Sequence, residues 1–245
     1  MDLTSNTVLI TGGATGIGFA LAERFLRERN EVIICGRREE ALDAAKRKHP
    51  ELKTRVYDVG KETQRVALHK WATKEFPRLN VLVNNAGIQR RVRIAEDKWK
   101  AAHEEIAINF EAPVHLTTLF LPHLARQGRP AILNVTSGLA FAPMAGTPIY
   151  SATKAALHSF TLSLRHQVSG TPIQVIEIIP PAVNTDLGGT GLHTFGVPVE
   201  EFVNAVMMGL REGEREIAYG FSQRASQASR PDLDEIFLRM NQAAS

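Results

Sequence analysis

The chain has 245 residues, of which 44% are hydrophobic and 22% are charged. This composition excludes a disordered or low-complexity protein and supplies enough apolar side chains for a substantial core. The formal net charge is +3, but the basic residues form only short, separated clusters such as Arg37-Arg38, so nucleic acid is not expected as a partner.

Cysteine content and apolar runs bear on location. Cys35 is the single cysteine, so no disulfide can form within the chain, and a reducing compartment is expected. The first residues lack a basic segment followed by an apolar one, and no apolar run approaches the roughly 20 residues that span a bilayer. We therefore expect a cytoplasmic protein with no membrane partner. The histidines form no HExxH motif, and no metal site is expected.

Short apolar segments rich in β-branched residues alternate with amphipathic segments along the chain. The expected strands are 7–11, 31–35, 55–59, 80–83, 131–136, 173–179 and 216–219. The expected helices are 17–25, 39–48, 63–76, a region from 97 to 126 divided near Pro113, 149–168, one after residue 198, and one around 233–240. Trp71 and Trp99 are expected to fill contacts between helices and sheet. The alternation predicts βαβ units, hence a doubly wound parallel sheet with helices on both faces.

No linker, repeat or charge block divides the chain, so residues 1–245 are expected to form a single domain. Residues 186–198 lie between the sixth strand and the next helix and are rich in glycine and threonine. A connection of this length is more often a lid or binding loop than a simple connector. We expect it to form part of a substrate site.

A glycine-rich turn follows the first strand, with glycines at 12, 16 and 18 in the stretch T-G-G-A-T-G-I-G. Such a turn lets a pyrophosphate approach the backbone and directs the N–H groups of the following helix at it. The spacing is not the strict G-x-G-x-x-G, and a tight strand–helix turn is the simpler alternative. Its position in the first βαβ unit favours a dinucleotide site.

The end of the second strand bears on the choice of cofactor. NAD sites usually carry an acidic residue there for the ribose hydroxyls, whereas this chain has Gly36 followed by Arg37 and Arg38. An uncharged slot does not repel a 2′-phosphate, and a guanidinium can pair with it. The sequence therefore favours NADP over NAD. The alternative is that the arginines merely cap a strand at the protein surface and bind no phosphate.

Polar residues also follow the third and fourth strands, where open α/β sheets bind ligands. Asp58 and Val59 end one of these strands, and Asn84-Asn85-Ala86-Gly87 follow the other. Asp58 can accept a hydrogen bond from an adenine amino group, although an aspartate in this position is more often a helix N-cap.

Tyr150 and Lys154 are spaced to lie on one face of a helix. A neighbouring ammonium is expected to lower the tyrosine pKa, so that the phenol can donate a proton to an alkoxide or take one from an alcohol. Ser137, just past the fifth strand, is expected to hold the substrate oxygen. The Y-x-x-x-K pattern alone is common in helices, but its combination with the glycine turn and Ser137 is not.

These residues together resemble a classical short-chain dehydrogenase/reductase. The matching features are 11–18, 84–87, Asn109 within I-N-F, Ser137 and Y-S-A-T-K at 150–154. They stand in the family's order and spacing, over about residues 5 to 220. Within the family, the stretches N-T-V-L-I-T-G-G and L-D-E-I-F-L-R-M-N are similar to a DltE-like bacterial subgroup.

The resemblance implies a Rossmann fold with strand order 3-2-1-4-5-6-7 and hydride transfer between nicotinamide and a carbonyl or alcohol. It implies that Tyr150 is the acid/base, that Lys154 binds the nicotinamide ribose and lowers the tyrosine pKa, that Ser137 polarises the carbonyl, and that Asn109 holds a relay water. Asp58 and Asn85 would contact the adenosine half. The full set of expected cofactor contacts is Gly12, Thr15, Gly16, Ile17, Gly18, Arg37, Arg38, Asp58, Val59, Asn85, Ala86, Gly87, Tyr150, Lys154, Pro180, Val183 and Thr185.

The chain departs from the family after the sixth strand, where Pro180-Pro181 stands in place of Pro-Gly. Proline lacks the N–H and the φ freedom of glycine, so the family's contact with the carboxamide is expected to shift. Thr185 remains in position to reach the nicotinamide side.

The leading functional prediction is an NADP-dependent oxidoreductase acting on a small carbonyl or alcohol substrate. The alternative is a non-catalytic dinucleotide sensor of the same fold. The presence of the complete set Ser137, Tyr150, Lys154 and Asn109 argues against it, because a sensor does not need all four. Family members commonly pair through the helices expected at 111–126 and 149–168, so a homodimer or homotetramer is expected. The helix around 233–240 either adds to that interface or docks on its own core.

Overall fold

The computed structural model describes residues 1–96 and 98–242. Its centre is a seven-stranded parallel sheet in the order β3-β2-β1-β4-β5-β6-β7, which confirms the predicted fold class. The strands are β1 (Thr7–Thr11), β2 (Glu31–Gly36), β3 (Lys53–Val56), β4 (Leu79–Asn84), β5 (Ala131–Val135), β6 (Gln174–Ile179) and β7 (Glu216–Ala218).

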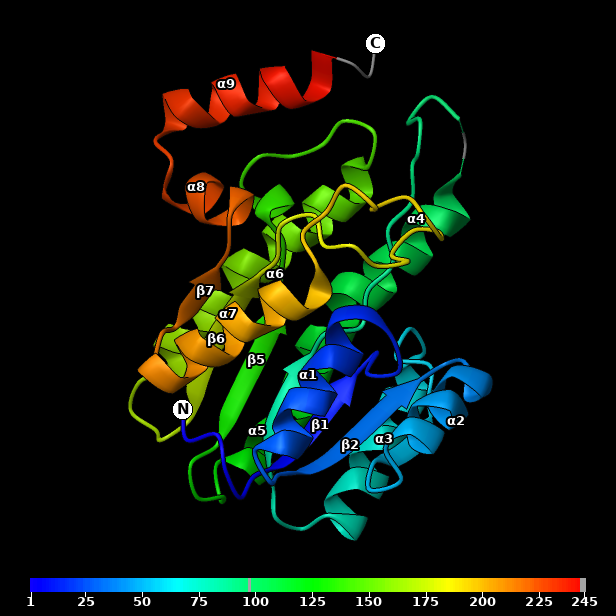
Figure 1. Ribbon diagram of the computed structural model, residues 1–245, viewed down its shortest axis with the longest axis vertical. Coiled ribbons are helices and arrows are strands. Elements are labelled where there is room, and N and C mark those ends of the chain that lie inside the picture. The colour runs from blue at the N-terminus through cyan, green and yellow to red at the C-terminus, as the bar shows by residue number, and fades with distance from the viewer. Residues whose placement is uncertain (97, 243–245) are drawn as a thin grey trace.

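Helices cover both faces of the sheet (Figure 1). The α-helices are α1 (Gly16–Arg27), α2 (Glu39–Lys48), α3 (Glu62–Glu75), α4 (Trp99–Ile106), α5 (Ala112–Leu124), α6 (Pro148–Gln167), α7 (Val199–Glu212), α8 (Phe221–Gln227) and α9 (Arg230–Asn241). Two shorter helical segments are η1 (Ala107–Glu111) and η2 (Gly138–Ala140).

The alternating side chains of each buried strand build two separate cores. Val8 and Ile10 of β1 pack toward α1, α2 and α7, whereas Leu9 packs on the opposite face toward α3, α5 and α6. This alternation follows from the period of two in a strand. Both faces of β1 are covered, so all five of its residues are buried, as expected for a parallel sheet.

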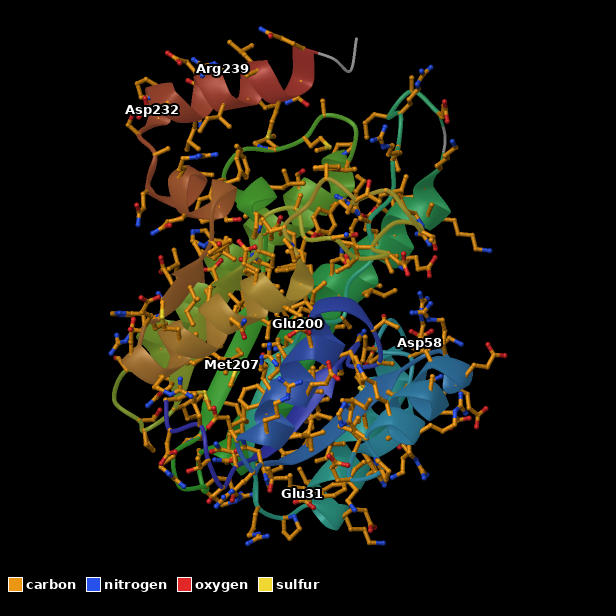
Figure 2. The ribbon with its side chains drawn as sticks, viewed as in Figure 1. Glu31, Asp58, Glu200, Met207, Asp232 and Arg239 are labelled. Carbon is orange, nitrogen blue, oxygen red and sulfur yellow. The ribbon has the colours of Figure 1, made fainter. Side chains whose placement is uncertain are left out.

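The strand order determines where a site can form. The connections reverse direction between β1 and β4, so the loops after these two strands diverge and leave a crevice at the carboxyl edge of the sheet. Figure 2 shows the two ends of the sheet: Glu31, at the start of β2, lies at the opposite edge from Asp58, which follows β3.

The helical region expected between 97 and 126 differs from the prediction. Asp97 lies outside the described residues, and α4 begins at Trp99. The division is not near Pro113, which lies in the first turn of α5, but at η1, a π-helical segment between α4 and α5. Pro113 has no N–H to donate to the preceding turn, and that preceding turn is η1.

Two further differences concern single elements. Strand β3 ends at Val56 rather than residue 59, so Asp58 and Val59 lie in the following turn. Trp71 packs against Tyr57 and Phe76 as expected. The same prediction for Trp99 is wrong, because this side chain is 65% exposed at the start of α4.

The C-terminal segment was only partly predicted. Helix α8 was not expected, and α9 lies apart from the sheet, beyond α8 (Figure 1). None of the residues of α9 is buried. The described part of the chain contains no helix long and apolar enough to cross a membrane.

Candidate functional site

One cavity of about 1290 Å³ runs along the carboxyl edge of the sheet. Every residue predicted from the sequence to contact a cofactor lines it, and so does Ser137. Asn109 does not line the cavity and lies behind its wall, almost fully buried. Residues from distant parts of the chain therefore meet in one space.

The glycine turn between β1 and α1 forms one end of the cavity. Gly12 and Gly16 have φ angles of 64° and 56°, in the left-handed region that favours glycine. At Gly18, an added Cβ would come within 2.4 Å of Asn85 Nδ2, so no larger residue fits. No side chain caps the start of α1, which leaves its first N–H groups available to an anion.

Asn85 holds this turn in place. Its Nδ2 donates to the carbonyl oxygens of Thr11 and Gly12, at 3.0 and 3.2 Å. The Thr11 hydroxyl oxygen in turn accepts hydrogen bonds from the backbone N–H groups of Asn85 and Ala86. The predicted contact of Asn85 with adenosine stays a prediction, and the hydrogen bonds that its amide group makes are to the backbone of the turn.

The end of β2 carries the arginines expected to recognise a 2′-phosphate. Arg38 Nη2 donates to Thr15 Oγ1 at 3.2 Å, next to the glycine turn. Arg37 Nη1 pairs with Glu104 Oε1 of α4 at 2.9 Å, and the other oxygen of Glu104 pairs with Arg90 at 2.5 Å. These arginines lower the pKa of Glu104 by hydrogen bonding. The ion pair of Arg37 was not predicted.

Asp58 is not a helix N-cap. Its Oδ1 accepts a hydrogen bond from the N–H of Gly60 at 3.0 Å, and the N-cap of α3 is Lys61. The carboxylate therefore closes a tight turn between β3 and α3 and lines the cavity there.

Ser137, Tyr150 and Lys154 meet where β5 ends and α6 passes. Ser137 follows β5, and its hydroxyl oxygen accepts a hydrogen bond from the N–H of Leu139 at 3.1 Å. Tyr150 and Lys154 lie one turn apart on α6, and both are buried. Burial raises the pKa of Tyr150 above its ordinary value, a hydrogen bond from the Ser137 side chain lowers it, and the Glu105 charge raises it.

Lys154 lies beside Tyr150, and its expected effect on the tyrosine pKa stays a prediction. Its Nζ lies 5.5 Å from the centre of the Tyr150 ring and donates to the carbonyl oxygen of Val135 at 2.8 Å. Burial lowers the pKa of Lys154 itself to about 8. Ser137 is the side chain whose hydrogen bond opposes the effect of burial on the pKa of Tyr150.

Asn109 lies in the π-helical segment η1, next to the active face of α6. Its Oδ1 accepts a hydrogen bond from the N–H of Ile88 at 2.9 Å, and its Nδ2 donates to the carbonyl oxygen of Ile88 at 2.8 Å. Nδ2 also lies 3.3 Å from Thr153 Oγ1. Asn109 thus joins the segment after β4 to α6, and the π turn orients its side chain for this.

Glu105 was missed from the sequence because a glutamate on an expected helix is usually solvated. Its side chain is fully buried one turn before Asn109. Oε1 accepts a hydrogen bond from the N–H of Arg90 at 3.3 Å, and Oε2 has no partner among the described residues. Burial raises the pKa of Glu105 to about 7.

The segment after β6 carries Pro180 and Pro181, and both line the cavity. The carbonyl oxygen of Pro180 accepts a hydrogen bond from the N–H of Gly138 at 2.9 Å, which ties it to the Ser137 region. Val183 pairs with Val197 and so closes the base of the 186–198 loop. Thr185 lies against the glycine turn, with its Cγ2 3.3 Å from where a Cβ of Gly16 would stand.

The cavity is also lined by apolar and polar side chains from five separate segments: Gln89, Arg90, Leu139, Met144, His193, Phe195, Phe221 and Met240. Two of them, His193 and Phe195, belong to the 186–198 loop that the sequence predicts to form part of a substrate site, whereas Gln89, Arg90, Phe221 and Met240 were not predicted. His193 Nδ1 is buried and has no hydrogen-bond partner among the described residues.

Comparison with known proteins agrees with this geometry. The family model described as short chain dehydrogenase matches residues 6–193. The chain is 50% identical to the uncharacterized oxidoreductase DltE of Bacillus subtilis, covering 98% of each chain. It is 34% identical to the NADP-dependent 3-hydroxy acid dehydrogenase YdfG of Salmonella typhi, over 75% of this chain and 73% of that protein.

Among solved structures, a short chain dehydrogenase from Burkholderia cenocepacia in complex with NADP is similar to this chain. Its TM-score is 0.85 at 26% identity, over 98% of this chain and 99% of the other. The match of the family model to most of the chain and the similarity to DltE over nearly its whole length agree with the strand order and the residues gathered in the cavity. The chain is an enzyme of the short-chain dehydrogenase family, an oxidoreductase that acts on CH–OH groups.

Proposed function

We propose that this enzyme is NADP-dependent and transfers hydride between the nicotinamide and a carbonyl group or secondary alcohol of a small molecule. The observation that carries the proposal is the meeting of Ser137, Tyr150 and Lys154 in the same cavity as the glycine turn. A sensor that only bound the dinucleotide would have no need of this buried acid, its hydroxyl partner and its lysine.

The residues present fit a dinucleotide. Gly12, Gly16 and Gly18 leave room for a pyrophosphate at the uncapped start of α1. Gly36 presents no carboxylate to a 2′-phosphate, and Arg37 and Arg38 stand beside it. The names of the Salmonella relative and of the Burkholderia structure, which mention NADP, support the same choice.

The other expected contacts follow the cavity from this end toward Tyr150. Asp58 and Val59 would border the adenosine half, with Asn85, Ala86 and Gly87 beside the glycine turn. Thr15 and Ile17 would contact the phosphates. Lys154, Pro180, Val183 and Thr185 would surround the nicotinamide half.

A bound nicotinamide supplies or accepts the hydride. Ser137 holds the substrate oxygen by a hydrogen bond, and Tyr150 donates its phenolic proton to that oxygen when a carbonyl is reduced. Burial raises the pKa of Tyr150, which suits the protonated phenol to the role of acid in carbonyl reduction. Asn109 fixes the segment after β4, and Lys154 lies beside Tyr150.

We further propose that the enzyme is cytoplasmic and forms a homodimer or homotetramer. The single cysteine, Cys35, is buried, and burial raises the pKa of its thiol to about 12. Such a thiol is unreactive, so it offers no disulfide partner to another chain.

The experiment is a titration of the purified protein with NADPH and NADH, followed by a panel of aldehydes, ketones and keto acids at saturating cofactor. NADPH absorbance is the readout. We expect tighter binding of NADPH and its consumption with at least one carbonyl compound. Binding without consumption across the whole panel would favour the sensor, and absence of binding would reject both.

A further inference from the structure

A fully buried carboxylate lies behind the site and has no role in the steps above. Glu177 is in β6 and has no solvent exposure. Its Oε1 accepts a hydrogen bond from Thr136 Oγ1 at 2.7 Å, and its two oxygens lie 3.0 and 2.9 Å from His158 Nδ1. A buried carboxylate is costly unless it is paired, and both oxygens of Glu177 have partners.

These two partners belong to the elements that carry the site. Thr136 immediately precedes Ser137 at the end of β5, and its N–H also donates to the carbonyl oxygen of Ile178 in β6. His158 lies one turn after Lys154 and two turns after Tyr150 on α6. Glu177 therefore connects the segment of Ser137 to the helix of Tyr150 through two hydrogen bonds.

The ring of His158 makes a second connection. Its centre lies 4.6 Å from the ring of Phe141, which follows η2 and so the Ser137 turn. The charged groups that act on His158 are Glu177 on β6, Glu216 on β7 and Arg165 on α6. The hydrogen bond to Glu177 is the largest influence and raises the pKa of His158.

We propose that Glu177 and His158 are positioning residues, which hold Ser137 at hydrogen-bonding distance from Tyr150 and the substrate oxygen. Neither touches the substrate. They act by fixing the end of β5 relative to α6, and a small displacement of a reacting group lowers the rate steeply. The expected changes in rate rest on the proposed function. The expected change in the position of Ser137 relative to Tyr150 does not.

The kinetic test compares Glu177→Gln and His158→Gln with the wild type in alcohol oxidation across pH. We expect kcat to fall about tenfold or more, with the KM for the nicotinamide cofactor nearly unchanged. Because the Ser137 hydrogen bond lowers the pKa of Tyr150, its weakening should move the acidic limb of the rate profile to higher pH. A purely structural role would reduce the amount of active enzyme without moving that limb.

Glu216→Gln is the matched control. This change removes a carboxylate that also acts on His158, but that contacts Arg165 on the surface instead of Thr136. We expect its kcat and pH profile to match the wild type. A wild-type profile in both Glu177→Gln and His158→Gln overturns the proposal. If Glu177→Gln does not fold, His158→Gln alone decides, because His158 is partly exposed and tolerates a change.

A readout without turnover separates this inference from the proposed function. Carbon-13 labelling of the tyrosine rings, with Tyr150→Phe for assignment, reports the hydrogen bond that Tyr150 receives. The Tyr150 resonance should shift in Glu177→Gln and His158→Gln in the same direction as in Ser137→Ala, and should not shift in Glu216→Gln. An unchanged resonance overturns the positioning role even if no substrate is found.

Discussion

Arg37 is the residue on which the proposed preference for NADP rests most, and it already has a partner. Its Nη1 pairs with Glu104, while the other guanidinium donors remain for a phosphate. No atom lies within 4 Å of a Cβ built on Gly36, so an aspartate fits there without displacing the chain. The cofactor slot can therefore be redesigned without repacking.

We predict that Gly36→Asp combined with Arg37→Ala reverses the cofactor preference. A charge-assisted pair with phosphate is worth roughly 1.5–3 kcal/mol, or about 10- to 150-fold in affinity. Fluorescence titration with NADPH and NADH measures the change. Gly36→Ala serves as control and should keep the wild-type preference. A double variant that still prefers NADPH would show that Arg37 does not bind the 2′-phosphate, and Arg38 would be tested next.

Glu105 should reveal its burial through the pH dependence of stability. Its folded pKa, about 7, exceeds the ordinary value of 4.5. Its protonated form is therefore favoured in the folded state. The contribution of Glu105 to the free energy of unfolding is fully present below pH 4.5 and is lost as the pH rises through 7. Glu105→Gln keeps an acceptor for the Arg90 N–H and removes this penalty.

We predict that Glu105→Gln unfolds with a free energy roughly 1–3 kcal/mol higher than the wild type at pH 8, and with nearly the same value at pH 4.5. Urea denaturation at the two pH values measures the difference. Glu104→Gln, which changes an exposed neighbour, should show no such gain. An equal or lower stability of Glu105→Gln at pH 8 would mean that its carboxylate is better compensated than the contacts indicate.

Single residues also mark the limit of sequence reasoning. Ser137, Tyr150 and Lys154 could be placed together because strand ends and helix spacing fix their positions. Glu105 and Glu177 could not, because a glutamate reveals nothing about its burial until the packing of neighbouring elements is known. The pairing of Arg37 with Glu104 spans 67 positions and leaves no local signal.

At the scale of elements, the sequence determines strands better than irregular helices. Apolar β-branched runs located the buried strands, whereas β3, which is largely exposed, lies at Lys53–Val56 and not at the expected 55–59. The π-helical segment η1 was not predicted, because the apolar pattern of a long helical region does not distinguish a single wider turn within it. Helix α9 was predicted, but the absence of buried residues on it was not.

The loop at 186–198 is the element most open to rearrangement. Its base is fixed by the pairing of Val183 with Val197, but Gly188, Gly189 and Gly191 have positive φ angles. Leu192 and Phe195 are exposed near its tip, and Phe195 lines the cavity. Burial of these two side chains over a bound substrate would exclude water from the hydride path.

We predict that NADPH with substrate protects this loop from proteolysis several-fold, through closure over the cavity. Limited digestion followed by mass spectrometry locates the cleavage. The exposed turn at 126–129, far from the cavity, provides the internal control and should be cut at an unchanged rate. Equal cleavage of the 186–198 loop with and without ligands would contradict a closing movement.

At the scale of the whole molecule, assembly is expected through α5 and α6. Leu116, Phe120 and Leu124 of α5 are buried in the core, so they are not available to a second copy. Val114 and Leu119 are half-buried, and Leu162 of α6 is 41% exposed. These partly exposed side chains are the apolar surface that α5 and α6 offer to a second copy of the chain.

We predict a dimer or tetramer by light scattering at micromolar concentration, and partial dissociation on Leu162→Asp, because a charge would be buried at the interface. Met208→Asp is the matched control, since Met208 is an exposed apolar residue on α7, 56% accessible. A monomeric wild type would reject assembly altogether. If both variants have the oligomeric state of the wild type, the interface lies elsewhere. The exposed Phe237 and Leu238 of α9 would then be the next surface to test.

The central claim is that Tyr150 donates the proton while hydride passes to a carbonyl carbon. The most direct measurement follows deuterium from labelled NADPH into the product of the best carbonyl substrate, in the wild type and in Tyr150→Phe. Phenylalanine preserves the ring that packs in this buried position, so folding and cofactor affinity should be unchanged. We predict deuterium at the carbinol carbon with the wild type and a rate at least ~10²-fold lower in the variant. Deuterium transfer at a similar rate in both proteins would contradict the account.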